Sequence, residues 1–462
     1  MSQAVFLTGG LMRHVATMSL TASVGILAIF AVDFVDMVFI AMLGEAELAS
    51  AIGYAGTLLF FTNAINIGLS IAAGTLVAQA LGRDDEQAAR EHATSVALFA
   101  LIISVAIPIV VLSNLAALLG WLGAEGETLA FSIRYCSVIL PTMFLMGLAM
   151  TAMAVLRSHG DAKVSMYVTL FGGIVNAVLD PILIFGFDLG LEGAAYASVM
   201  ARLTMAVGGI WYVIRAHRGF EKPSFALVIR DTKEVSALAG PAVLTNLATP
   251  IGTAIITREM AKFGTEAVAA MAVIGRLTPL AFAAVLALSG AIGPIVGQNY
   301  GAGQFERVRG AFKAGLVFIT VYVISVTILL FFSRTFIADL FEASGEMRDL
   351  IFLFCGPLAL FQIFNGAIFV CNASFNNLGH PYYSTVVNWG RHTLGTLPFA
   401  LAGAAIAGAS GVLTGQAVGG VIFAVIGTAL AWRLTGSLQS NKEIDEFAKH
   451  QNVHQVTIRR NW

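Results

Sequence analysis

The sequence contains few charged residues. Asp, Glu, Lys and Arg make up only 11% of its 462 residues, whereas a water-soluble domain carries about 25%. Hydrophobic residues account for 58% of the chain, and the mean hydropathy is +0.83. Several apolar runs exceed the roughly 18 residues that indicate a membrane-spanning helix. This composition predicts an all-α polytopic membrane protein.

The sequence also lacks the motifs of catalytic and ATP-driven sites. It has no Gly-Lys dipeptide, so a P-loop for ATP is absent. Its three cysteines, Cys136, Cys355 and Cys371, lie in separate apolar stretches and predict neither a disulfide framework nor a metal cluster. The net charge of −1 gives no indication of nucleic-acid binding. We therefore expect no enzymatic activity, no cofactor or metal centre, and no nucleic-acid partner.

Hydropathy predicts twelve transmembrane helices separated by short polar segments. An even number of spans places both termini on the same side of the membrane. The predicted spans lie near residues 16–43, 49–81, 92–121, 128–156, 164–187, 191–214, 236–262, 266–298, 308–338, 349–377, 383–406 and 409–433.

Lysine and arginine residues are distributed unequally between the two sets of loops. One side has eighteen of them, at Arg13, Arg83, Arg90, Arg157, Lys163, Arg215, Arg218, Lys222, Arg230, Lys233, Arg307, Arg309, Lys313, Arg433, Lys442, Lys449, Arg459 and Arg460. The opposite loops offer only Lys262, Arg334 and Arg348. Because cytoplasmic loops are enriched in Lys and Arg, we expect a multi-pass protein of the inner (cytoplasmic) membrane with both termini cytoplasmic.

The two halves of the chain match each other. The segment VAQALGRDDEQAAR (Val77–Arg90) aligns with VGQNYGAGQFERVR (Val296–Arg309) at a constant offset of 219 in the numbering. The same offset pairs Cys136 with Cys355, and an offset of 220 pairs GEAELASA (44–51) with GTEAVAAM (264–271). Several matches in order indicate a duplication.

This repeat predicts two six-helix lobes in the same orientation, related by a pseudo-two-fold axis along the membrane normal. Secondary transporters are often built in this way, with the substrate site between the halves. The expected parts are an N-terminal lobe (1–215), a cytoplasmic linker (216–234), a C-terminal lobe (235–435) and a polar cytoplasmic tail (436–462).

Ionisable residues inside the predicted spans are the candidate functional residues, because a charge at mid-bilayer costs roughly 2.5–3.5 kcal/mol. Asp33 and Asp36 lie three residues apart in the first span, and Asn176 and Asp180 lie four apart in the fifth, so each pair shares a helix face. Asp36 aligns with Ile256 of the second half. The fold therefore does not require an acid there, which favours a function for Asp36.

Two chemical roles are open for these residues. Two neighbouring carboxylates cannot both ionise easily in a low dielectric, so Asp36 and Asp180 are suited to relay a proton. Their oxygens, with Asn176, would equally suit Na⁺. The structural alternative is that each acid only hydrogen-bonds a neighbouring helix. Asp33, Arg202, Arg276 and Thr21 are possible accessory residues.

Four motifs resemble the multidrug and toxic compound extrusion (MATE) family over nearly the whole chain. They are VDMVFIAMLGEAELASAIG (35–53), LRSHGDAK (156–163), NAVLDPILIFGFDLGLEGAAYAS (176–198) and GPIVGQNYGAG (293–303). The resemblance implies two bundles in a V shape and efflux driven by entry of H⁺ or Na⁺. It implies that Asp36 is the coupling carboxylate, that Asn176 and Asp180 share this role, and that Ser198 supplies a hydroxyl.

Two departures from the family pattern bear on mechanism. Family members often have a proline in the first helix, linked to bending on protonation, where this sequence has Thr21. Some members also place acids in the second lobe, and no acid here lies convincingly within that cavity. The first departure argues against a proline-driven bend, and the absence of a second-lobe acid favours coupling through the first lobe, as in the DinF-like branch.

The resulting prediction is a monomeric antiporter, coupled to H⁺ rather than Na⁺, that exports amphipathic, often cationic compounds by alternating access. One alternative is a flippase for lipid-linked precursors, which would need a strongly cationic central cavity. Arg202 and Arg276 are the only deep candidates for such a cavity. A membrane enzyme or receptor is a second alternative, and no catalytic constellation supports it.

Overall fold

The computed structural model describes residues 4–43 and 46–459, and the side chains of this range up to residue 438 except 41 and 46. Gly44 of the repeat and Arg460 of the basic set lie outside the described residues. The described residues form helices and no strands. The first half contains α1 (Leu11–Met42), α2 (Ala46–Gly82), α3 (Glu86–Ser113), α4 (Leu115–Trp121), α5 (Gly126–Ile139), η1 (Leu140–Thr142), α6 (Met143–Ser158), α7 (Ala162–Pro181), η2 (Ile182–Gly186), α8 (Gly190–Tyr212) and η3 (Val213–His217). The second half contains α9 (Phe225–Met260), η4 (Ala261–Phe263), α10 (Thr265–Ala281), α11 (Ala283–Gly301), α12 (Phe305–Leu340), α13 (Gly345–Leu353), η5 (Phe354–Leu358), α14 (Gln362–Asn377), α15 (Pro381–His392) and α16 (Leu397–Arg459).

Long helices dominate because a chain in lipid must satisfy its backbone hydrogen bonds within each segment. Nine helices of the described chain are long and apolar enough to cross a membrane, and eleven spans result when the two bent pairs, α10 with α11 and α13 with α14, are each taken as one. One of the nine runs from Pro381 to Leu438, and its 58 residues would measure about 87 Å as a straight helix. That is far more than the roughly 30 Å of the hydrocarbon core.

This long segment is a hairpin of two spans. The backbone leaves helical geometry at Ala407 and Gly408, where Gly408 has φ +60°. The chain then folds back on itself, since a Cβ added at Gly411 would lie 1.9 Å from the Gly403 carbonyl oxygen, and one at Gly419 would lie 1.5 Å from that of Gly395. The hairpin brings the described chain to twelve spans and confirms the predicted fold class.

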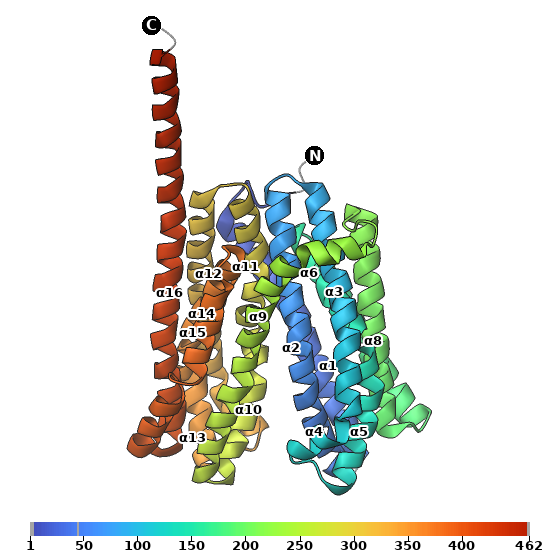
Figure 1. Ribbon diagram of the computed structural model, residues 1–462. Helices are drawn as coiled ribbons and strands as arrows, with labels where there is room; N and C mark the ends of the chain where they lie inside the picture. The colour runs from blue at the N-terminus through green and yellow to red at the C-terminus, as the bar shows by residue number, and fades with distance from the viewer. Residues whose placement is uncertain (1–3, 44–45, 460–462) are drawn as a thin grey trace.

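The helices form two bundles, one from α1 to α8 and the other from α9 to α16 (Figure 1). The bundles meet at the end of the molecule near both termini and diverge toward the opposite end. Of the segment expected as a linker, only residues 218–224 lie outside helices. The first turns of α9 then cross between the bundles and carry the chain into the second one (Figure 1).

The bundles are joined by two equivalent contacts. Gln79 Nε2 donates to the Asn377 carbonyl at 2.9 Å, and Gln298 Nε2 donates to the Ser158 carbonyl at 2.7 Å. The two glutamines correspond to each other in the repeat, and so do the two residues that accept from them. The contact is therefore self-complementary about a pseudo-two-fold axis, as in an isologous dimer.

Candidate functional site

The three main candidate residues come together where α1 packs against α7. The two helices are in contact at Gly25 of α1, where an added Cβ would lie 3.6 Å from Thr169 Cβ of α7, an ordinary van der Waals distance. Asn176 and Asp180 lie one turn apart on α7 and face Asp36 of α1. The sequence spacing placed the α7 pair on one face, and the helix packing adds the residue from α1.

A single amide links the two acids. Asn176 Nδ2 donates to Asp36 Oδ1 at 3.0 Å and to Asp180 Oδ2 at 2.9 Å. Asp180 is fully buried, Asn176 is 4% exposed and Asp36 is half-buried. Asp180 Oδ1 is buried and has no hydrogen-bond partner among the described residues. The site thus contains a buried acceptor that a proton or a cation would satisfy.

The helix changes form immediately after Asp180. Pro181 has no N–H, so the carbonyl four residues earlier loses its usual helical partner. The chain continues from Ile182 to Gly186 as a π-helix rather than an α-helix. Short π-helical segments are frequent at functional sites. Pro181 is therefore followed by a change of helical type.

The remaining candidates lie around this centre without joining it. Asp33 is exposed on α1, one turn from Asp36. Ser198 and Arg202 both lie beside the Tyr135 side chain, which sequence reasoning did not single out. Arg202 Nη1 reaches Met143 Sδ at 3.5 Å. Described side chains place no carboxylate within ion-pair distance of Arg202.

Arg276 and Thr21 occupy different settings. Arg276 is exposed on α10, and its Nη2 lies 3.2 Å from Met37 Sδ of α1. It therefore reaches across from the second lobe to the residue that follows Asp36. Thr21 is partly exposed in α1, which is one uninterrupted helix.

A small cavity lies on the pseudo-two-fold axis. Its volume is about 60 Å³, enough for a few water molecules. Its walls come in pairs that correspond to each other in the repeat, namely Ser70 with Ser289, Ile71 with Gly290, Gly74 with Gly293, Thr75 with Pro294, Ala154 with Ala373 and Arg157 with Asn376. Asn377 completes the lining, so the two lobes contribute almost equally to the cavity.

Arg157 brings a positive charge to this cavity. Its position in the sequence predicts a loop residue, but the structure places it in the cavity wall, because the last turn of α6 faces the axis. Its Nη1 donates to Ser165 Oγ at 3.2 Å. Arg391 is a second partly buried cation, and its Nη1 donates to Asn365 Oδ1 at 2.7 Å. Neither guanidinium forms an ion pair with a carboxylate of the described chain.

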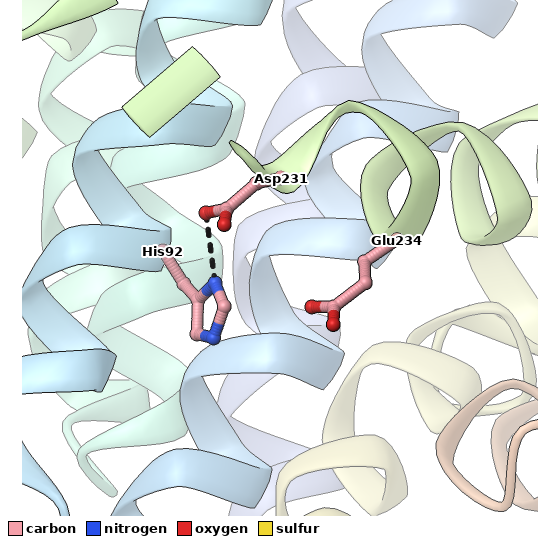
Figure 2. Close-up of side chains that lie close together, drawn as sticks. All are labelled: His92, Asp231 and Glu234. Atoms are coloured by element: carbon pink, nitrogen blue, oxygen red, sulfur yellow. Dashed lines mark hydrogen bonds and ion pairs between the residues drawn. The ribbon is translucent and has the colours of Figure 1, made fainter. Parts of the chain in front are cut away.

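A separate polar cluster ties α9 to α3. His92 Nδ1 lies 2.9 Å from Asp231 Oδ2, and Glu234 points toward the same space (Figure 2). Asp231 also accepts from Arg230 Nε at 2.7 Å. Since Asp231 is already balanced by this arginine, we assign the cluster the structural role of fixing the start of α9 to the first lobe.

Two homologous membrane bundles with an axial cavity and buried acids have the architecture of a secondary transporter. The MatE family model matches residues 22–182 and 241–402, and the starts of the two matches differ by the offset of the repeat. The chain therefore belongs to the MatE family of membrane transporters, and it is a transporter rather than an enzyme. The paired matches also agree with the register of the repeat.

Curated relatives and solved structures agree with this assignment. The chain is 28% identical over 436 residues to a FAD transporter of Shewanella oneidensis, covering 91% of this chain and 94% of that protein. It is 26% identical over 405 residues to the multidrug export protein MepA of Staphylococcus aureus, covering 78% and 87%. The bent form of the Vibrio cholerae MATE transporter VcmN matches with a TM-score of 0.86 and 24% identity, over 93% and 98% of the two chains. This likeness confirms the fold.

Proposed function

We propose that the protein exports amphipathic, often cationic small molecules by alternating access, coupled to proton entry at Asp36 and Asp180. The observation that carries the proposal is the buried pair of acids bridged by Asn176, with an unpaired oxygen on Asp180. Two carboxylates this close repel one another, and a bound proton removes the repulsion. In the proposed cycle, protonation changes the relative stability of the two lobe arrangements and thereby the affinity for substrate.

The orientation of Asn176 supports a proton over Na⁺. Its amide nitrogen, rather than its oxygen, faces both carboxyl groups. A sodium ion needs oxygen ligands, so it would have to displace this nitrogen and turn the amide. A proton needs no such change, because it can sit on Asp180 Oδ1 while both existing hydrogen bonds remain.

The proposed orientation puts the end that carries both termini in the cytoplasm, in the inner membrane, with the protein acting as a monomer. The excess of Lys and Arg at that end supports it. The lobes meet there, so this arrangement would be closed to the cytoplasm. Separation of the lobes at the axis would open the cavity, whose wall residues come almost equally from both sides.

Transport in proteoliposomes tests the coupling role. Purified protein is reconstituted with ethidium on one side, and a pH gradient or a Na⁺ gradient is imposed. We expect the pH gradient alone to drive dye movement, and Asp36→Asn to abolish it. Asp33→Asn is the matched control, since it removes an exposed carboxylate one turn away, and it should transport like the wild type. Dye movement driven by Na⁺ alone would contradict the proton, and wild-type transport by Asp36→Asn would contradict the site.

An anionic substrate is the second candidate. The relative named FAD transporter aligns over nearly its whole length, and FAD carries a diphosphate. Partly buried guanidinium groups without a carboxylate partner among the described side chains, at Arg157 and Arg391, favour a negatively charged ligand. These two residues add to Arg202 and Arg276 and make the interior more cationic than the sequence predicts.

Transport of FAD and of ethidium, measured in the same vesicles, distinguishes the two substrate classes. If an anionic dinucleotide is exported, FAD should move under the pH gradient and Arg157→Gln should slow it at least about tenfold. Ethidium transport by Arg157→Gln should then be unchanged or faster. If the wild-type protein transports ethidium but not FAD, the substrates belong to the cationic class.

A further inference from the structure

An apolar groove of about 550 Å³ lies in the second lobe, between α12, α14 and α16. Leu316, Ile319, Ile363, Phe364 and Val425 form much of its wall. The groove ends at Trp432 and Arg433 of α16, at the end of the molecule where the basic residues gather. This site is separate from the axial cavity and from the paired acids.

Three cations surround this end of the groove. The guanidinium carbon of Arg309 lies 4.5 Å from the centroid of the Trp432 ring, and Lys313 Nζ lies 5.1 Å from it. Arg309 and Lys313 are one turn apart on α12 and so share a face. Arg433 is exposed and lines the groove itself. The result is a cluster of positive charges at one end of the apolar groove.

None of these cations is neutralised by the described part of the chain. Arg309, Lys313 and Arg433 take part in none of the ion pairs between described side chains. Arg309 Nε is buried and has no hydrogen-bond acceptor there. The Trp432 ring attracts the two nearer cations but accepts no conventional hydrogen bond. A buried donor left unpaired is unfavourable, and an added anionic oxygen would satisfy it.

In the first lobe, the linker of the chain itself supplies the groups at the position that corresponds to Arg309 and Trp432. In the register of the repeat Arg90 corresponds to Arg309 and Val213 to Trp432. Arg90 Nε lies 3.6 Å from Glu221 Oε2 of the linker. The neighbouring Phe220 packs against the cluster that contains Val213. The linker thus supplies the first lobe with a carboxylate and an apolar ring side by side.

We propose that an anionic phospholipid fills the corresponding place in the second lobe. One acyl chain occupies the groove between α12, α14 and α16, and the phosphate lies among Arg309, Lys313 and Arg433. The lipid has the same two parts as the linker pair Phe220–Glu221, an anionic group joined to an apolar one. The charge cluster selects an anionic headgroup, and the groove requires an attached chain.

Lipid binding to the purified full-length protein tests the proposal. Native mass spectrometry and thermal unfolding are recorded with phosphatidylglycerol, with phosphatidylcholine and with glycerol 3-phosphate, which has the anionic group without the chains. We expect phosphatidylglycerol alone to bind and stabilise. The double variant Arg309→Gln/Lys313→Gln should lose about 30-fold in affinity for it. The matched control Arg13→Gln/Lys163→Gln, which removes two exposed cations elsewhere, should retain wild-type affinity.

Other results would overturn the proposal. Equal binding of the two phospholipids would show that the groove takes any lipid, and equal binding of glycerol 3-phosphate would show a site for free phosphate. Wild-type affinity in the double variant would exclude the cation cluster. If the double variant does not fold, Arg433→Gln, at an exposed position, replaces it and should lose about fivefold. Unchanged affinity in that variant would count equally against the site.

Discussion

The two lobes share one skeleton but differ in the polar groups of their interiors. In the first lobe Asp36, Asn176 and Asp180 form a hydrogen-bonded set between α1 and α7. In the repeat register Asp36 corresponds to Ile256, which is fully buried. The second lobe therefore has the corresponding helix but no acid at the position of Asp36.

The α7 positions diverge in the same way. Asn176 corresponds to Gly395 and Asp180 to Phe399. In the second lobe a Cβ at Gly395 would lie 2.9 Å from the Gly419 carbonyl oxygen, so this position serves close packing of the hairpin. The polar group of the second lobe is instead Arg391, with Asn365 as its partner. The first lobe thus carries the paired acids, and the second lobe holds a positive charge at Arg391.

The two glutamine contacts between the lobes did not diverge. Gln79 and Gln298 make the same hydrogen bond in opposite directions. Each glutamine must fit both its own lobe and the contact with the other lobe, so two constraints act on one side chain. At Asp36 and Ile256 the two copies differ.

The largest effect on transport is expected at the acid site of the first lobe, where the two lobes differ most. Asp180→Asn should reduce gradient-driven transport at least about tenfold, because it removes the buried oxygen that would accept the proton. Phe399→Leu changes the corresponding position of the second lobe and should leave the dependence on the pH gradient intact. Transport assays in proteoliposomes with both variants measure this difference. Equal losses in the two would mean that the lobes contribute alike.

The glycines at the axis should behave as an equivalent pair. A Cβ at Gly82 would lie 2.1 Å from the Gln298 carbonyl oxygen, and one at Gly301 would lie 2.1 Å from that of Gln79. Gly82→Ala and Gly301→Ala should each lower the free energy of unfolding by about 3 kcal/mol, since backbone must move. Gly56→Ala on α2 meets nothing within 4 Å and is the control. Unequal losses at the two axial glycines would contradict the symmetry.

Much of this comparison was accessible from the sequence. The break between the predicted spans 383–406 and 409–433 falls at Gly408, where the hairpin turns. The helical spacing of Asn176 and Asp180 predicted a shared face, because helical geometry is local. The offset found between the two halves of the sequence is also the offset between the residues that meet on the axis.

Other features depend on packing that the sequence does not encode locally. Arg157 was counted with the loop residues because it lies at a helix end, and only the approach of the two lobes turns that end into a cavity wall. Tyr135 lies beside Ser198 and Arg202 through the packing of α5 on α8. The cluster of His92, Asp231 and Glu234 joins distant segments (Figure 2). No spacing rule links residues that lie so far apart along the chain.

The axial glutamines should differ slightly despite their symmetry. Gln298 donates to the Ser158 carbonyl and also accepts from the Phe6 backbone N–H at 2.9 Å. Within the described chain the Gln79 side chain makes only the bond to Asn377. Each buried group left unpaired costs about 1–3 kcal/mol, so Gln298→Leu should destabilise roughly twice as much as Gln79→Leu. Thermal unfolding in one detergent measures the difference, and a larger loss for Gln79→Leu would contradict it.

The smallest effect is expected at the linker. The pair of Arg90 and Glu221 is partly exposed on both sides, so Glu221→Gln should lower the free energy of unfolding by less than about 1 kcal/mol. The variant frees Arg90 and makes the first lobe resemble the second. Phosphatidylglycerol should therefore raise the melting temperature of Glu221→Gln more than that of the wild type, and phosphatidylcholine should not. Lys222→Gln, the neighbouring linker residue, is the control. An equal response of variant and wild type would show that the linker does not take the place of a lipid. The correspondence between the Arg90–Glu221 pair of the first lobe and the cation cluster of the second would then fail.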